Sequence, residues 1–224
     1  MSGPGPLALV GGGEWRDGST VDAELLEASG ASEVLVLPTA AAYEHPDRAV
    51  AVARAWFGGI GAEVRGLEVL QRSDALDPDH VAAVAGARFI YLGGGSPLHL
   101  RSVLKDSPVL EAIRSAWQDG AVLAGSSAGA MALCDPMIDP RGGAFTVGLG
   151  LVVGLAVLPH ADSRVADEHR RTLELAEPTT CVVALPERTA VVRGPDGTWR
   201  AAGADPGEVR IFRAGEVVGL DDLP

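Results

Sequence analysis

The stretch Ala121-Val-Leu-Ala-Gly-Ser-Ser-Ala-Gly-Ala-Met131 joins a short apolar run to a cluster of small residues. Its first four residues are typical of a buried strand, and its last four can open a helix. The G-x-S-x-G spacing of Gly125–Gly129 has Ser127 at its centre. In such a strand–turn–helix the serine is exposed as a nucleophile, and the next N–H, of Ala128, points to where an oxyanion forms. A close-packed strand–helix crossing accounts for these five residues equally well, so the rest of the chain must decide.

The chain before this stretch alternates apolar runs with segments that carry helix signals. Asp77-Pro78, Ser96-Pro97 and Ser107-Pro108 each pair a capping residue with a proline at the first helical position. Because the apolar runs are continuous, they predict a parallel sheet covered by helices on both faces. The expected strands are Leu7–Val10, Glu33–Leu37, Val64–Leu70, Arg88–Leu92 and Ala121–Ala124.

Small and polar residues follow several of these strands. Gly11–Gly13, Thr39, Gly93–Gly95 and Ser127 all stand at carboxyl ends, which meet at one edge of a parallel sheet. In open α/β sheets the functional site lies at that edge.

The pattern changes after Met131. Asp135–Ala144 is expected as a loop, the apolar segment Gly148–Leu158 follows, and Asp162 caps a helix that runs to Leu175. We predict an α/β fold: a doubly wound, mostly parallel sheet with helices on both faces and a C-terminal antiparallel β extension. No repeat or linker divides it, so residues 1–224 are expected to form a single domain. The later strands are expected at Cys181–Leu185 and Thr189–Arg193, then as a small meander of Trp199–Ala202, Val209–Arg213 and Glu216–Leu220.

Charge and cysteine content exclude several classes of protein. The formal net charge is −12 and the basic residues are scattered, which argues against nucleic-acid binding. Cys134 and Cys181 form no CxxC pair, so we expect neither a disulfide framework nor a zinc site. Cys134 lies seven residues past Ser127 and is expected to be a small core residue. No cofactor and no metal are expected.

No segment has the character of a targeting or membrane sequence. Met1–Pro6 lacks the basic and apolar regions of a signal peptide. The longest apolar stretch, Val147–Leu158, is shorter than a membrane span and is broken by glycines. A soluble cytoplasmic protein without membrane partners is therefore the expectation.

A nucleophilic serine needs a base and a group that orients the base. His160 is the favoured base because it ends an apolar strand and follows Ser127 in the chain, while His45 lies in a strand-end loop. Glu187, in a short turn between two strands, and Asp139, in the loop between Ser127 and His160, are both candidate orienting carboxylates. Spacing alone leaves the choice open, since a loop carboxylate is usually only solvated.

The glycines after Leu92 are the natural source of a second oxyanion donor. Three glycines allow backbone N–H groups to approach a substrate closely. A tight strand–helix turn, the alternative reading, needs only one of them.

Together these motifs resemble a known family. Tyr91-Leu-Gly-Gly-Gly95 followed by Gly125-Ser-Ser-Ala-Gly-Ala130 is similar to serine peptidase family S51, which contains aspartyl dipeptidase (peptidase E) and cyanophycinase. The resemblance implies a sheet like that of class I glutamine amidotransferases, with serine in place of the elbow cysteine. It covers most of the chain, and Ile211–Glu216 also resembles the C-terminal hairpin of peptidase E.

The resemblance also implies roles for single residues. Leu158-Pro-His-Ala161 implies His160 as the base, and Leu185-Pro-Glu187 implies a Ser-His-Glu triad completed by Glu187. The chain departs from the family pattern in two places. Ser96 stands where peptidase E commonly has asparagine, and Ser127 and His160 are only 33 residues apart. Some members are assigned an acidic residue in that connecting loop, which keeps Asp139 as a rival to Glu187.

These inferences combine into one hypothesis: a serine-type hydrolase that cleaves amide bonds of small acidic peptides through an acyl-enzyme. Ser127 attacks, His160 takes its proton and Glu187 orients His160. A homodimer is left open. The alternatives are a catalytically silent binding module of the same fold and a small-substrate esterase. The expected oxyanion donors are Ala128 and Gly94 or Gly95, and the expected substrate-binding residues are Ser96 and Arg164.

Overall fold

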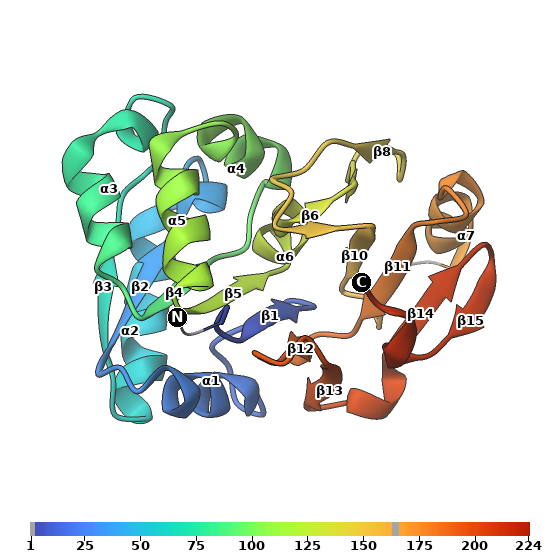
Figure 1. Ribbon diagram of the computed structural model, residues 1–224, viewed down its shortest axis with the longest axis horizontal. Coiled ribbons are helices and arrows are strands. Elements are labelled where there is room, and N and C mark those ends of the chain that lie inside the picture. Colours follow the sequence, from blue (N-terminus) through green and yellow to red (C-terminus); the bar gives the residue numbers. More distant parts are fainter. Residues whose placement is uncertain (1–2, 163–165) are drawn as a thin grey trace.

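The computed structural model describes residues 3–162 and 166–224, which are organised around two adjoining sheets (Figure 1). The first sheet has seven strands. β1, β5, β4, β2 and β3 run parallel, whereas β12 pairs antiparallel with β1 and β13 pairs antiparallel with β12. In spatial order the strands are β13 (Trp199–Gly203), β12 (Thr189–Arg193), β1 (Leu7–Val10), β5 (Val122–Ser126), β4 (Phe89–Leu92), β2 (Glu33–Leu37) and β3 (Glu63–Gly66).

Helices cover both faces of this sheet, as the apolar strands predict. Alternate residues of each strand enter different cores: Leu7 and Leu9 pack with α4, α5 and α6, while Ala8 and Val10 pack with α1 and α2. This two-sided burial is the reason why the strands read as continuous apolar runs. The helices are α1 (Val21–Ser29), α2 (Pro46–Gly59), α3 (Pro78–Ala85), α4 (Pro97–Leu104), α5 (Pro108–Gln118) and α6 (Ala128–Leu133).

The predicted caps are in place on three helices. The side chains of Asp77, Ser96 and Ser107 accept hydrogen bonds from backbone N–H groups at the starts of α3, α4 and α5. Each of these helices has proline in its first turn, where a missing N–H costs nothing.

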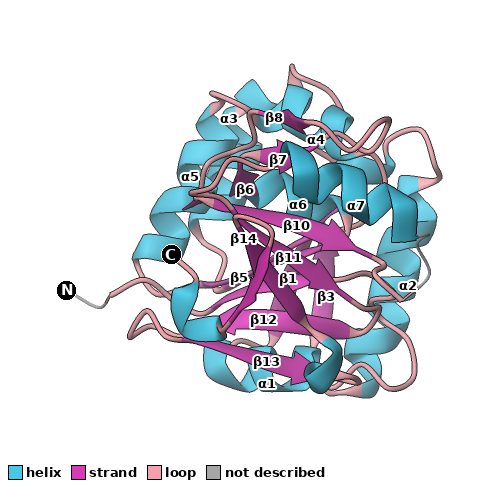
Figure 2. Ribbon diagram, turned by 90° about the vertical axis from the view of Figure 1, so that its right-hand side faces the viewer, coloured by secondary structure: helices cyan, strands magenta, loops and turns pink. Residues whose placement is uncertain are grey.

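The second sheet has six strands, which lie between residues 134 and 218 of the chain (Figure 2). β10 and β11 pair in parallel, with Pro159 opposite Leu185, and the short strands β6 and β9 also pair in parallel. A short hairpin, β7 (Met137–Ile138) and β8 (Phe145–Thr146), and the helix α7 (Ala166–Leu175) complete this part. The strands in order are β15 (Glu216–Val218), β14 (Arg210–Arg213), β11 (Cys181–Leu185), β10 (Leu155–Pro159), β6 (Cys134–Asp135) and β9 (Val152–Val153).

The C-terminal strands differ from the single meander expected from the sequence. β13 extends the first sheet through β12, whereas β14 and β15 extend the second sheet through β11. The chain crosses between the sheets in the turn Pro186–Arg188, because β11 pairs with β10 and β12 pairs with β1. The antiparallel extension is therefore present but shared between two sheets.

Smaller differences concern element ends. β3 stops at Gly66 instead of continuing to Leu70, and Thr39, expected only as a strand-end residue, begins a 3₁₀ turn that runs to Ala41. Three further 3₁₀ turns are Asp74–Leu76, Pro206–Glu208 and Leu220–Asp222.

In the part of the chain that the structure describes, no helix is long and apolar enough to cross a membrane.

Candidate active site

Ser127 lies at a strained turn between β5 and α6. Its backbone has φ 48° and ψ −106°, a region that non-glycine residues rarely occupy. Its N–H donates to Val10 O at 2.9 Å, which fixes the turn against β1. The flanking glycines are needed because a Cβ on Gly129 would lie 2.2 Å from Leu92 O. The glycine motif thus serves both purposes that the sequence suggested: it allows close packing of the strand and the helix, and it places Ser127 at the strained turn.

His160 and Glu187 approach this serine from the second sheet. The His160 Nε2 atom lies 3.0 Å from Ser127 Oγ, and its Nδ1 atom lies 2.9 Å from Glu187 Oε1. His160 directly follows β10 and Glu187 follows β11 by one residue, so the parallel register of these strands brings both side chains to one edge. About a third of each side chain is exposed. The three residues form a continuous hydrogen-bonded chain.

Gly11–Gly13, the glycine run that follows β1, packs against both His160 and Glu187. The N–H groups of His160 and Arg188 donate to Gly11 O and Gly12 O at 2.8 and 2.7 Å. A Cβ on Gly12 would lie 2.2 Å from His160 Cε1, and one on Gly13 would lie 2.9 Å from Glu187 Oε2. The glycines therefore let the imidazole and the carboxylate pack directly on backbone. From the sequence we identified this run only as the end of a strand, although three consecutive glycines indicate that other groups can approach the backbone closely.

A cavity of about 530 Å³ opens over these residues. Arg16, His45 and Arg48 bring basic side chains to it, and Glu14 and Glu44 bring carboxylates. Of the expected histidines, His45 thus reaches the cavity, while His160 contacts the serine. Among the described residues, no group of three His, Cys, Asp or Glu side chains is arranged to hold a metal ion. The remaining lining residues are Gly13, Trp15, Ala49, Val52, Gly94, Gly95, Ser127, His160 and Glu187.

Gly94 does not present a vacant N–H to this cavity. Its N–H donates to Glu14 Oε1 at 3.1 Å, and Ser126 Oγ donates to Glu14 Oε2 at 2.7 Å. Gly95 has φ +131°, a conformation suited to glycine, and a Cβ there would lie 2.4 Å from Ala40 O. Sequence reasoning missed Glu14, since its only signal was an acidic residue directly after a strand-end glycine run.

The other expected site residues lie elsewhere. Asp139 is paired with Arg141 at 2.6 Å in the β7–β8 loop, and this hydrogen-bonded partner lowers the Asp139 pKa to about 2. Of the two candidate carboxylates, Glu187 is the one against His160. Ser96 Oγ accepts from His99 N as the cap of α4, so its role in substrate binding stays a prediction. Arg164 falls outside the described residues.

Cys134 is fully buried, as expected of a core residue. Burial raises the pKa of its thiol, which keeps the sulfur protonated and unreactive. Its Sγ donates to Ala130 O at 3.3 Å, within the structure that supports α6.

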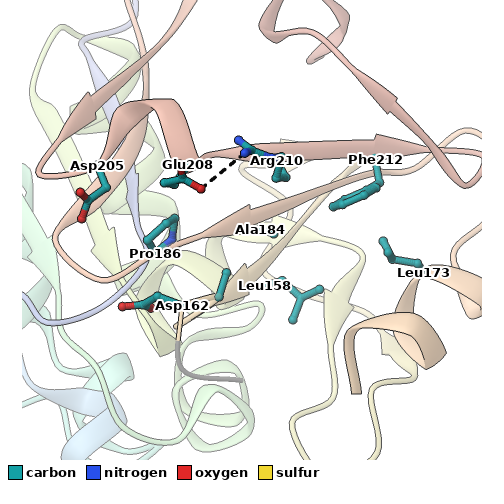
Figure 3. A pocket seen from close by; sticks show the side chains of 10 residues that line it. Leu158, Asp162, Leu173, Ala184, Pro186, Asp205, Glu208, Arg210 and Phe212 are labelled. Carbon is teal, nitrogen blue, oxygen red and sulfur yellow. Dashed lines mark hydrogen bonds and ion pairs between the residues drawn. The ribbon is translucent and has the colours of Figure 1, made fainter. Parts of the chain in front are cut away.

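A second cavity, of about 290 Å³, adjoins the segments that carry His160 and Glu187 (Figure 3). Its floor is apolar, with Leu158, Ala184 and Phe212 on the second sheet and Leu173 on α7. None of Ser127, His160 and Glu187 lines it. Ser127, His160 and Glu187 line the larger cavity, whereas the charged residues of this second cavity are Asp162, Asp205, Glu208 and Arg210.

A strained serine in hydrogen-bond contact with an imidazole, on a mostly parallel α/β sheet, defines the class of serine-type hydrolases. Comparison with known families narrows this class. The family model described as "Peptidase family S51" matches residues 7–198, so the chain belongs to peptidase family S51 and is a serine-type peptidase.

Individual relatives agree with this assignment. Peptidase E of Citrobacter koseri is 28% identical over 201 residues, covering 84% of this chain and 82% of the relative. A cyanophycinase of Synechococcus elongatus is also 28% identical over 214 residues, but the match spans 66% of its length. A solved peptidase from an acI-B1 actinobacterium superposes with a TM-score of 0.82 at 30% identity, covering 97% of this chain and 98% of that one.

Proposed function

We propose that this chain is a serine exopeptidase that cleaves short peptides containing acidic residues, using Ser127 as nucleophile, His160 as general base and Glu187 as the group that orients it. One observation carries the proposal: the hydrogen-bonded chain from Ser127 Oγ through the imidazole to Glu187, with links of 3.0 and 2.9 Å. Both distances lie within the range needed for proton transfer and for orienting a base.

The chemistry follows the steps of acyl transfer. His160 Nε2 accepts the proton of Ser127 as the hydroxyl attacks the scissile carbonyl, and Glu187 stabilises the imidazolium that forms. The protonated His160 then gives its proton to the leaving amine, and a water molecule deprotonated by the same ring hydrolyses the acyl-enzyme. The N–H of Ala128, at the start of α6, is the proposed oxyanion donor; a donor of this kind contributes on the order of 3 kcal/mol.

The preference for acidic substrates rests on the charges around the cavity. Arg16 and Arg48 both line it, and a guanidinium binds a carboxylate in a bidentate manner. The similarity to proteins named peptidase E and cyanophycinase supports a peptide or a peptide-like polymer as substrate.

An active-site serine probe tests the mechanism. A fluorophosphonate should label the parent protein and should fail to label Ser127→Ala, while Ser126→Ala keeps its labelled serine. Equal labelling of parent and Ser127→Ala would sink the proposal. No labelling and no turnover of aspartyl dipeptides, β-aspartyl-arginine or γ-glutamyl amides would instead favour a catalytically silent module.

A further inference from the structure

Glu14 is a charged residue of the cavity to which the mechanism assigns no role. Its carboxylate is half-buried and is held at both oxygens, by the Gly94 N–H at 3.1 Å and by the Ser126 hydroxyl at 2.7 Å. Ser126 directly precedes the proposed nucleophile. Two donors in these positions fix the carboxylate instead of leaving it to move with solvent.

Two buried hydroxyls, of Ser126 and Tyr91, lie behind this carboxylate. The pKa of Tyr91 is raised well above its usual value, chiefly by burial and then by the charges of Asp22 and Glu14. Tyr91 therefore stays a neutral hydroxyl, and the hydroxyl of Ser126 donates to Glu14.

Among the described residues, no basic side chain lies in ion-pair contact with this carboxylate. Arg16, His45 and Arg48 line the same cavity, yet none of them forms an ion pair with Glu14. The carboxylate is also close to the reacting serine. A Cβ built on Gly94 would lie 3.0 Å from Glu14 Oε1 and 3.7 Å from Ser127 Cβ. A fixed anion at this point repels an oxyanion and attracts a cation of the substrate.

We propose that Glu14 determines specificity by binding the α-ammonium group of the substrate residue whose carbonyl Ser127 attacks. The inference rests on the proposed function and deepens it. The α-nitrogen is separated from the attacked carbonyl carbon by one atom, about 2.5 Å across those two bonds. A group that binds it must therefore stand beside the nucleophile, as Glu14 does. The ammonium of a lysine side chain lies several bonds farther away. In this arrangement the Gly94 N–H holds Glu14, and the oxyanion is left to the N–H of Ala128.

The test uses Glu14→Gln, which keeps the shape of the side chain and removes its charge. The substrates are twin peptides of one sequence, one with a free N-terminus and one N-acetylated. The parent should prefer the free peptide in kcat/KM by about 100-fold or more, and Glu14→Gln should cut this preference at least tenfold. Glu44→Gln removes a carboxylate from the same cavity and should leave the preference within about threefold.

Other outcomes overturn the proposal. An increase in turnover of both twins in Glu14→Gln would make the carboxylate an internal blocker of the Gly94 N–H. An equal loss on both twins would make it a structural support. A loss confined to N-acetyl-lysyl peptides, absent for free norleucyl peptides, would assign it to a side-chain ammonium.

Failure of the proposed function remains separable. Fluorophosphonate labelling does not require an ammonium group, so Glu14→Gln should label at close to the parent rate. A parent that fails to label defeats both proposals. A parent that labels, and whose preference for the free twin is unchanged in Glu14→Gln, defeats only the role of Glu14.

Discussion

The proposed nucleophile and the proposed base reach the candidate site by different routes. Ser127 is positioned by neighbouring residues in the chain: β5, a strained turn and α6 follow one another without a break. His160 and Glu187 are positioned by pairing between strands, because β10 and β11 run parallel and end at the same edge. The first half of the site is thus local in sequence and the second half is assembled by the fold.

The two halves of the site are therefore sensitive to different changes. The turn at Ser127 has its strain held by packing against β1 and β4, so it persists as long as the first sheet does. The imidazole is held by a carboxylate from one turn and by glycine backbone from another.

The largest effect is expected from replacing Glu187, the carboxylate that contacts the imidazole of His160. Glu187→Gln should lower kcat by about 10³–10⁴-fold, because an amide no longer holds the imidazole in the required tautomer or stabilises its charge. Asp139→Asn is the control, since Asp139 pairs with Arg141. Steady-state turnover of the best peptide substrate measures both. A larger loss in Asp139→Asn than in Glu187→Gln would reverse the assignment of the orienting carboxylate.

A smaller effect is expected where the backbone of Gly12 contacts the His160 ring. In Gly12→Ala the new Cβ would meet the His160 ring at 2.2 Å, so the ring must move by about 1 Å, a displacement that costs on the order of 100-fold in kcat. The matched control is Gly61→Ala, which also has positive φ (+91°) but has nothing within 4 Å of the new Cβ. Circular dichroism should find both variants folded. Unchanged turnover in folded Gly12→Ala would show that the imidazole does not need this backbone surface.

The smallest effect is expected at Asp22, a buried residue of α1. This carboxyl is buried, and burial raises its pKa to about 6 in spite of hydrogen bonds from Ser19 and Trp56. Since the folded-state pKa lies above the ordinary value of 3.8, the protonated group stabilises the fold at low pH. That contribution is lost as the pH rises from about 4 to 6.

Asp22→Asn should remove this pH dependence. Between pH 5 and pH 7.5 the parent should lose roughly 1 kcal/mol of unfolding free energy that the variant keeps. Urea unfolding at the two pH values measures the difference, and Asp17→Asn, at an exposed position in the preceding loop, should behave as the parent does. The same pH slope in parent and Asp22→Asn would contradict a buried, protonatable Asp22.

The contrast between the halves also explains what the sequence could predict. The parallel sheet, its covering helices, the caps at Asp77, Ser96 and Ser107 and the turn at Ser127 are all encoded over short spans, and pattern reasoning finds them. The division of the C-terminal strands between two sheets depends on pairing with β1 and β10 across the chain, which no local pattern records.

Long-range contacts also separate the two candidate carboxylates. Spacing alone left Glu187 and Asp139 open, and only the family resemblance favoured Glu187. In the structure the parallel register of β10 and β11 brings Glu187 to His160, whereas Asp139 pairs with Arg141. Glu14 went unnoticed because its partners, Gly94 and Ser126, are 80 and 112 residues away. Arg16 lies in a loop and Arg48 in α2, and only the tertiary fold brings both residues to the cavity.

The glycine run after β1 has a consequence for how the molecule opens. Gly11 O accepts the N–H of His160, which directly follows β10, so an amide at the end of the second sheet is bonded to the first sheet at the site itself. This amide can exchange its hydrogen with solvent only when the sheets part. It should be among the slowly exchanging amides even though the His160 side chain borders open water. Loss of activity on heating should then coincide with cooperative unfolding, since the site and the junction of the sheets are the same place.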